Sequence, residues 1–149
     1  MDHSLVTLTP CTLGYISHDE LNRVSNQRPN LAAALWRETL IDASISREWL
    51  VNLGRREAAP RMAHLLMEMY TRLKSIGQAR DGHFVFPVTQ NDLADCLGLS
   101  TVHVNRVLQQ FRKEGLLTVT RYDYQILEWQ RLQKLAAFDD AYLHLSPRR

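Results

Sequence analysis

The sequence has few cysteines and no long apolar run. Two cysteines, Cys11 and Cys96, cannot form a disulfide framework or supply the four thiolates of an iron–sulfur cluster, and we expect both to be buried, reduced thiols. No apolar stretch approaches the roughly 20 residues that span a bilayer, and no basic and then apolar leader opens the chain. These absences predict a soluble, cytoplasmic protein with no membrane partner.

Catalytic and metal-binding patterns are also lacking. The six histidines, two cysteines and scattered carboxylates show no spacing typical of a nucleophile, a metal site or an acid–base pair. We therefore expect no enzymatic activity, no catalytic or metal-binding residue and no cofactor. The formal net charge of +2 is mildly basic, but residues 80–124 hold as many acidic as basic side chains, so charge alone does not indicate a nucleic-acid partner.

The first thirty residues predict two strands and a short helix. Residues 5–9 and 11–16 have the pattern of a strand, a break at Pro10 and a second strand. A lone hairpin is marginal in water, so this one must pack on another element or be the remnant of a larger sheet. Ser17, with Glu20 three positions later, predicts the N-cap of a short helix that runs toward Val24.

A long helix is predicted over residues 31–53. One stripe of this helix has apolar or small residues at steps of three and four, namely Trp36, Thr39, Ala43, Ser46, Leu50 and Leu53. Ile41, Ile45 and Trp49 form a second apolar band beside the stripe, and if nothing covered that band the chain should aggregate. Two arrangements are open: burial among several helices of one chain, or a parallel two-helix dimer seam. The seam is favoured, because only a short hairpin is available within the chain to cover the helix.

A break follows the long helix at residues 54–60. Proline is tolerated in a first helical turn but not inside a helix, so Pro60 predicts a new helix that begins near Glu57 and a hinge before it. Met62, Leu66, Met69, Leu73 and Ile76 give this second helix a buried face, and Gly77 ends it. Residues 84–88 then predict a short strand.

Residues 89–111 predict a helix-turn-helix. Thr89 and Asp92 form a capping-box pattern, Gly98 supplies the left-handed backbone of a tight turn, and Ser100 caps the second helix. An ordinary helical hairpin within a core is the alternative. The residues expected to face inward from the two helices are Leu93, Ala94, Leu97, Leu99, Val104, Val107, Leu108 and Phe111.

The second helix of this motif would present a polar face to DNA. Arginine is the commonest reader of guanine, asparagine pairs with adenine, and valine contacts the thymine methyl group. The candidate base-reading residues are Thr101, Val102, Asn105 and Arg106, with Gln109 beside them. The candidate phosphate-contacting residues are Thr89, Asn91, Ser100, His103 and Arg121.

A predicted hairpin over residues 116–127 would form a wing, with Arg121 at its tip. For Arg121 and for His103, a solvated side chain is an equally good interpretation. Residues 128–137 predict a short amphipathic helix that turns Trp129 and Leu132 inward, and the tail from Tyr142 to Arg149 is expected to be irregular.

These residues resemble the Crp/Fnr family of bacterial regulators. The resemblance rests on T-x-x-D-L-A-D-x-L-G-L-S-x-V-H-V-N-R-V-L-Q-x-F-R-K-E-G-L-L at residues 89–117, on the LEWQRLQKLAAFDDAYLHL tail at residues 127–145, and on the helix, break and helix around residues 54–60. It implies that the long helix forms a parallel dimer and that the break is the hinge between a sensor and a DNA reader. RNA polymerase is a further candidate partner.

The sequence departs from that family in three places. Residues 1–16 match only the last hairpin of the eight-stranded β-roll that holds the effector. The Gly-Glu and Arg-Ser/Thr elements that hold a cyclic phosphate are absent, and so is the four-cysteine arrangement of the oxygen sensors, so cyclic-nucleotide binding is not expected. In the recognition helix, Thr101 and Val102 replace an Arg-Glu pair, whereas the later arginine matches Arg106.

The sequence thus predicts a mainly α fold with small β elements, in three parts. Residues 1–30 would be the remnant of the β-roll, residues 31–56 the long dimerisation helix and hinge, and residues 57–149 a winged helix-turn-helix domain. The expected function is sequence-specific regulation of transcription by a homodimer that binds double-stranded DNA at a two-fold symmetric site. One alternative is a sensor-less chain that pairs with a full-length relative and modulates it, and another is a sequence that begins inside a longer product.

Overall fold

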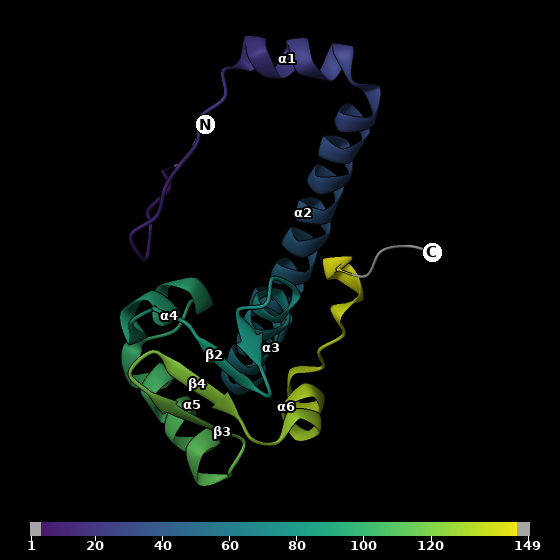
Figure 1. Cartoon of the computed structure of the whole chain (residues 1–149). Helices are drawn as coiled ribbons and strands as arrows, with labels where there is room; N and C mark the ends of the chain where they lie inside the picture. The colour runs from purple at the N-terminus through teal and green to yellow at the C-terminus, as the bar shows by residue number, and fades with distance from the viewer. Residues whose placement is uncertain (1–3, 146–149) are drawn as a thin grey trace.

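The computed structural model describes residues 4–145, and the outer ends of the first and last predicted parts lie outside this range. An extended segment leads into helix α1 (His18–Gln27) and then into the long helix α2 (Pro29–Arg55). Helix α2 rises from a body formed by the elements that follow it, and α1 crosses its far end (Figure 1). The body contains α3 (Ala58–Ser75), β1 (Ala79–Arg80), β2 (His83–Val85), α4 (Gln90–Leu97), α5 (Thr101–Lys113), β3 (Leu117–Thr120), β4 (Asp123–Ile126), α6 (Trp129–Ala136) and the 3₁₀ turn η1 (Asp140–Leu143).

The core of the body lies between helix α3, the sheet and helices α4 to α6. Its central side chains come from elements far apart in the sequence and are almost completely buried: Met62, Leu66, Phe84, Leu97, Phe111 and Leu132. Of the predicted buried face of α3, Met62 and Leu66 are buried, Met69 and Leu73 are half-buried against the core, and one residue is exposed. Ile76 is 66% exposed, because the helix ends at Ser75 and the chain turns at Gly77, where φ is +74°. The mainly helical fold with small β elements is confirmed.

The four strands form one antiparallel sheet in the order β1-β2-β4-β3. The wing hairpin is confirmed as β3 and β4, and the predicted strand at residues 84–88 is shorter and shifted, since β2 ends at Val85. Strand β1 was not predicted. It joins β2 through Asp81 and Gly82, whose φ angles of +51° and +82° are those of a type I′ turn.

The hairpin predicted over residues 5–16 is wrong. Residues 4–17 contain no strand and are exposed, including apolar side chains such as Val6 and Tyr15. Alternation of polar and apolar residues specifies a strand only where a second surface covers its apolar face. The short helix after this segment is confirmed, with the Ser17 side chain accepting a hydrogen bond from the Glu20 amide at 3.2 Å.

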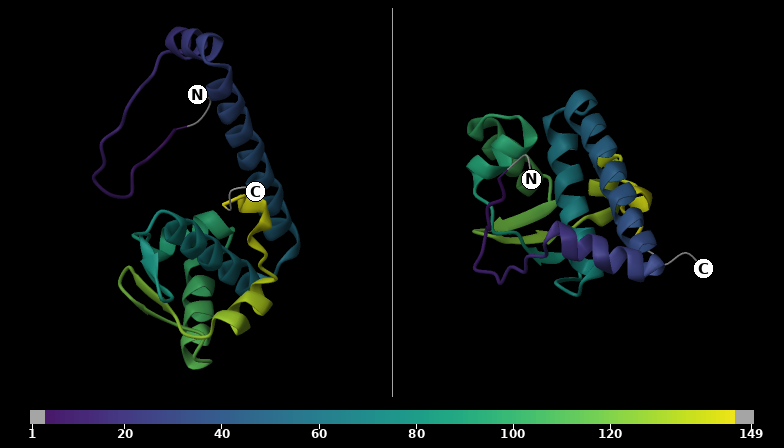
Figure 2. Two further views of the ribbon diagram at one scale, coloured as in Figure 1. Left: turned by 45° about the vertical axis from the view of Figure 1, so that its right-hand side comes forward. Right: turned by 90° about the horizontal axis from the view of Figure 1, so that it is seen from above.

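The long helix and the break after it are confirmed. Helix α2 begins with Pro29 in its first turn and ends at Arg55, and α3 begins at Ala58. The second apolar band on α2 is partly covered from within the chain: Ile45 and Trp49 pack on the core and η1 lies against α2 (Figure 2), whereas Ile41 is half-buried and lines a groove. The helix thus has one covered side and one open side.

The cysteines differ from expectation. Cys11 and Cys96 are free, as predicted, but both are exposed rather than buried. Cys96 lies on the outer side of α4, whose inner face is formed by Leu93 and Leu97.

Candidate nucleic-acid interface

A capping box fixes the start of α4. The Thr89 side chain accepts a hydrogen bond from the Asp92 amide at 3.2 Å, and the Asp92 carboxylate accepts one from the Thr89 amide at 2.7 Å. The Thr89 hydroxyl also donates to that carboxylate, and these hydrogen bonds to the Thr89 backbone and hydroxyl lower the pKa of Asp92. The Thr89 hydroxyl hydrogen is therefore occupied within the cap.

The turn between α4 and α5 is held by Gly98 and by an arginine from α3. Gly98 has a φ of +60°, which a residue with a Cβ adopts only at a cost. The Arg61 guanidinium donates to the Leu97 carbonyl at 2.6 Å and to the Arg56 carbonyl at 2.8 Å. Arg61 thus ties the turn of the motif to the break between α2 and α3, a role that the local sequence pattern did not reveal.

Helix α5 has a buried face and an open face, as predicted. Val104, Val107, Leu108 and Phe111 are buried in the core. The candidate base-reading residues lie on the remaining surface, where Val102 is 78% exposed, Arg106 is exposed, and Thr101 and Asn105 are half-buried, with Gln109 exposed beside them.

Asn105 and Arg106 differ in whether they form hydrogen bonds with other residues. The Asn105 amide donates a hydrogen bond to the Gln90 side chain on α4 at 3.3 Å, a contact that was not predicted. Arg106 makes no hydrogen bond or ion pair with any residue between positions 4 and 145, and it lines a shallow groove with Glu57, His103 and Gln110. The guanidinium is thus not engaged by any of the residues that the structure describes.

The five candidate phosphate-contacting residues do not all lie in one place. Ser100 caps α5 by accepting a hydrogen bond from the His103 amide at 3.2 Å, which leaves the Ser100 hydroxyl hydrogen available as a donor. Asn91 is exposed in the first turn of α4. Thr89 and Arg121 line a second groove, of about 350 Å³, between the start of α4 and the wing.

The charged side chains on α5 itself are all basic, although the region around it is balanced. Helix α5 carries Arg106, Arg112 and Lys113 and no acidic residue. The nearest acidic residue along the chain, Glu114, follows the last turn of the helix, away from Arg106. The exposed surface of α5 is therefore locally basic.

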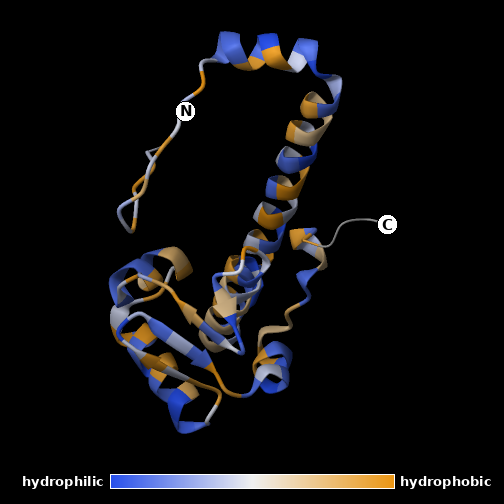
Figure 3. Cartoon of the chain, viewed as in Figure 1, coloured by the Kyte–Doolittle hydropathy of each residue, from blue (hydrophilic) through white to orange (hydrophobic). Residues whose placement is uncertain are grey.

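Apolar residues recur along α2 (Figure 3), and the residues of the predicted stripe lie on the open side of that helix. Trp36, Leu50 and Leu53 are 67%, 71% and 42% exposed. The hydroxyls of Thr39 and Ser46 donate to the carbonyls of Leu35 and Asp42 one turn earlier, at 3.1 and 2.8 Å. Because these hydroxyls are satisfied within the helix, the stripe can be covered by a second surface without leaving them unpaired. The remaining residue of the stripe, Ala43, is half-buried.

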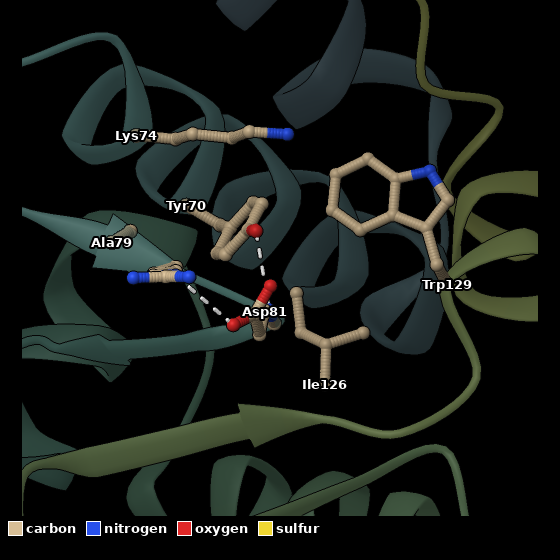
Figure 4. A pocket seen from close by; sticks show the side chains of 8 residues that line it. Tyr70, Lys74, Ala79, Asp81, Ile126 and Trp129 are labelled. Carbon is tan, nitrogen blue, oxygen red and sulfur yellow. Dashed lines mark hydrogen bonds and ion pairs between the residues drawn. The ribbon is translucent and has the colours of Figure 1, made fainter. Parts of the chain in front are cut away.

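A groove of about 480 Å³ lies apart from both surfaces, between α3, the β1–β2 turn and the start of α6 (Figure 4). The Tyr70 hydroxyl accepts a hydrogen bond from the Gly82 amide at 3.1 Å, and the Lys74 ammonium lies 5.9 Å from the centre of the Tyr70 ring. No predicted site residue lines this groove, and its hydrogen bond supports the turn between β1 and β2.

Comparison with known proteins identifies the body. Residues 60–135, just over half of the chain, match the model of the Crp-like helix-turn-helix domain. The chain belongs to the Crp/Fnr family. The family resemblance drawn from residues 89–117 and 127–145 is thereby confirmed.

Similar proteins cover this chain for most of its length. The nitrogen fixation regulation protein FixK of Bradyrhizobium diazoefficiens is 29% identical over 115 residues, which are 77% of this chain and 48% of FixK. The transcriptional regulatory protein btr of Bordetella pertussis is 25% identical over 132 residues, 89% of this chain and 54% of btr. The structure of FixK2 from Bradyrhizobium japonicum superposes with a TM-score of 0.74 at 27% identity, over 83% of this chain and 61% of FixK2. The chain thus spans about half the length of the relatives it matches.

Two further kinds of feature, membrane-spanning helices and metal-ion sites, were sought in the described part of the chain. Not one of its helices combines the length and the hydropathy that crossing a bilayer requires. Within residues 4–145, no group of three or more His, Cys, Asp or Glu side chains is placed to hold a metal ion.

Proposed function

We propose that the chain is a sequence-specific DNA-binding regulator of transcription that acts as a homodimer on a two-fold symmetric site. The observation that carries this proposal is the open, basic face of α5, a helix whose opposite face is locked into the core by Phe111 and its neighbours. The names of the FixK and btr relatives, which describe regulatory proteins, support it.

In the proposed complex, α5 enters the major groove and its exposed residues contact base edges. Arg106 would pair with guanine, Asn105 with adenine, and Val102 would touch a thymine methyl group, with Thr101 at the start of the helix. Gln90 would orient the Asn105 amide through their hydrogen bond.

Phosphate contacts would flank the base contacts. The free hydroxyl hydrogen of Ser100, the side chain of Asn91 and the imidazole of His103 would contact one stretch of backbone. Arg121 and Thr89, which line one groove, would contact another stretch of the DNA backbone, and the Thr89 hydroxyl would exchange its hydrogen bond to Asp92 for one to a phosphate.

The open stripe on α2 would form the dimer seam, because two copies would bury Trp36, Leu50 and Leu53 against each other. Full burial of a large apolar side chain contributes about 1.5–3 kcal/mol, and several such pairs along the seam would offset the free-energy cost of association. The two copies of α5 would then lie in successive major grooves, about 34 Å apart.

A binding experiment tests the proposal. Inverted repeats are selected from random DNA with the wild-type chain, and affinities are measured by fluorescence anisotropy. Arg106→Ala is expected to weaken binding by about 1–3 kcal/mol, roughly 5- to 150-fold, because it removes a base contact. Arg80→Ala, which removes the same charge from the exposed β1 edge of the sheet, should change affinity by less than about twofold. The absence of any preferred inverted repeat at moderate salt would contradict the proposal, and so would an unchanged affinity of the Arg106 variant.

The open stripe would also accept α2 of a longer relative, which is the second candidate function. Capture of a tagged full-length relative by this chain, in place of self-association, would favour that alternative. RNA polymerase as a partner stays a prediction.

A further inference from the structure

The last segment of the described chain, residues 137–145, returns to α2 and lies beside it (Figures 1 and 2). We call this segment the C-terminal clasp. Its turn η1 contacts both α2 and α3, and its Phe138 and Leu143 side chains are buried. The clasp therefore touches the long helix and the DNA-reading body at the same time.

A buried carboxylate joins the three elements. Glu68 on α3 is 1% exposed. Its Oε2 atom accepts a hydrogen bond from the Tyr142 hydroxyl of the clasp at 2.7 Å and another from the Trp49 indole of α2 at 3.1 Å. The Tyr142 hydroxyl also lies 3.0 Å from Nε2 of His64 on α3. Because a buried carboxylate is costly without such partners, these bonds favour one arrangement of α2, α3 and the clasp.

A second group of contacts lies at the break itself. The Arg56 guanidinium donates to the Glu48 carboxylate at 2.7 Å and, more weakly, to the Ala137 carbonyl of the clasp at 3.5 Å. The Arg56 carbonyl accepts from Arg61, which also holds the Leu97 carbonyl at the end of α4. Contacts thus run from α2 through the break to the turn of the helix-turn-helix.

We infer that the C-terminal clasp is a positioning device for DNA recognition: Tyr142, through Glu68, sets the angle between α2 and the body that carries α5. This inference rests on the proposed dimer. In a dimer joined along α2, that angle determines the separation of the two α5 helices, which must match the spacing of the two half-sites. The residues of the clasp need not touch DNA to affect which spacing is preferred.

The test compares DNA duplexes that differ only in half-site spacing. Duplexes carry the selected inverted repeat, the same repeat with one or two base pairs inserted, or a single half-site, and affinities are measured by fluorescence anisotropy. The wild-type chain should prefer the selected spacing. Tyr142→Phe should reduce that preference by about tenfold, a part of the 100- to 10,000-fold gain that bivalent binding provides, and leave single half-site affinity within about twofold.

Two further variants separate positioning from a general loss of stability. Tyr70→Phe removes a tyrosine hydroxyl that hydrogen-bonds within the body but does not reach α2, so it should keep the wild-type spacing preference. Trp49→Phe removes the bond to Glu68 from the α2 side and should repeat the effect of Tyr142→Phe.

The outcomes distinguish this inference from the proposed function. If the wild-type chain prefers one spacing and both the Tyr142 and the Trp49 variants keep that preference, the positioning role is overturned while the proposed function stands. If the wild-type chain binds an inverted repeat no better than a single half-site, the proposed dimeric function fails and the positioning role fails with it.

Discussion

The two parts of the molecule on either side of Arg56 differ in what their apolar side chains contact. Among the described residues, every buried hydrophobic side chain lies between Met62 and Leu143, whereas 13 of the 19 exposed large hydrophobic side chains lie before Arg56. In the part after Arg56, most large apolar side chains are buried against other residues of the same chain. The part before it presents apolar surface that only another molecule, or further protein outside the described range, can cover.

The largest expected effect is loss of the body's core. Phe111 on α5 is fully buried, and Phe111→Ala should lower the free energy of unfolding by about 3–5 kcal/mol through lost burial and the cavity left behind. Urea unfolding measures this. Val102→Ala on the open face of the same helix should change stability by less than about 0.5 kcal/mol. Equal effects of the two variants would show that α5 does not have the buried and open faces described.

The next effect concerns the first part of the chain. Leu50 is 71% exposed, so Leu50→Ala should leave the unfolding of the body nearly unchanged but weaken self-association by about 1.5–3 kcal/mol, because the proposed dimer seam would bury this side chain. Sedimentation equilibrium measures the association. Glu38→Ala, on the same helix outside the stripe, is the control. A dimer of undiminished stability in the Leu50 variant would place the seam elsewhere.

A smaller effect is expected at the turn of the helix-turn-helix. Gly98→Ala places a Cβ at a φ of +60° and should cost about 1 kcal/mol of unfolding free energy. Gly98→Asn should cost less, because asparagine tolerates the left-handed region better. Thermal unfolding of the two variants ranks them, and a reversed ranking would argue against backbone conformation as the reason for this glycine.

The smallest effect is the pH dependence of the contact between the two parts. Burial, with the nearby charge of Arg56, lowers the pKa of His64 below the usual histidine value of about 6.5, against the opposing charges of Glu48 and Glu68. The unfolded chain therefore binds a proton at His64 more readily than the folded chain does, so this group contributes to stability above about pH 6.5 and that stability is lost as the pH falls below it. The midpoint of thermal unfolding should decrease between pH 7 and pH 5, and less so in His64→Gln. If the midpoint of thermal unfolding changed equally with pH in the wild-type chain and in His64→Gln, His64 would not be a source of the pH dependence.

The sequence predicted well where short-range signals decide the structure. The capping box of Thr89 and Asp92, the glycine at position 98 and the Ser100 cap all act within a few residues, and the structure contains each of them. Strand β1 also had a local signal, since Asp81 and Gly82 form the pair typical of a type I′ turn.

Interactions between distant residues were not predictable in this way. Tyr142 and Glu68 are 74 positions apart, and no periodicity links them. The same limit explains the hairpin wrongly predicted at residues 5–16: its pattern is local, whereas strand formation depends on a covering surface. The roles of the α5 and wing residues in DNA binding, and of the α2 stripe in dimer formation, remain predictions that the experiments above test.

The central claim is that the body reads DNA only in pairs joined through α2, and the stoichiometry of the complex tests it most directly. Sedimentation velocity of the wild-type chain with a duplex carrying the selected inverted repeat should show two chains per duplex, and Leu50→Glu should lower the affinity for the repeat toward that for a single half-site. A complex of one chain per duplex, with equal affinity for the repeat and for the single half-site, would contradict the claim.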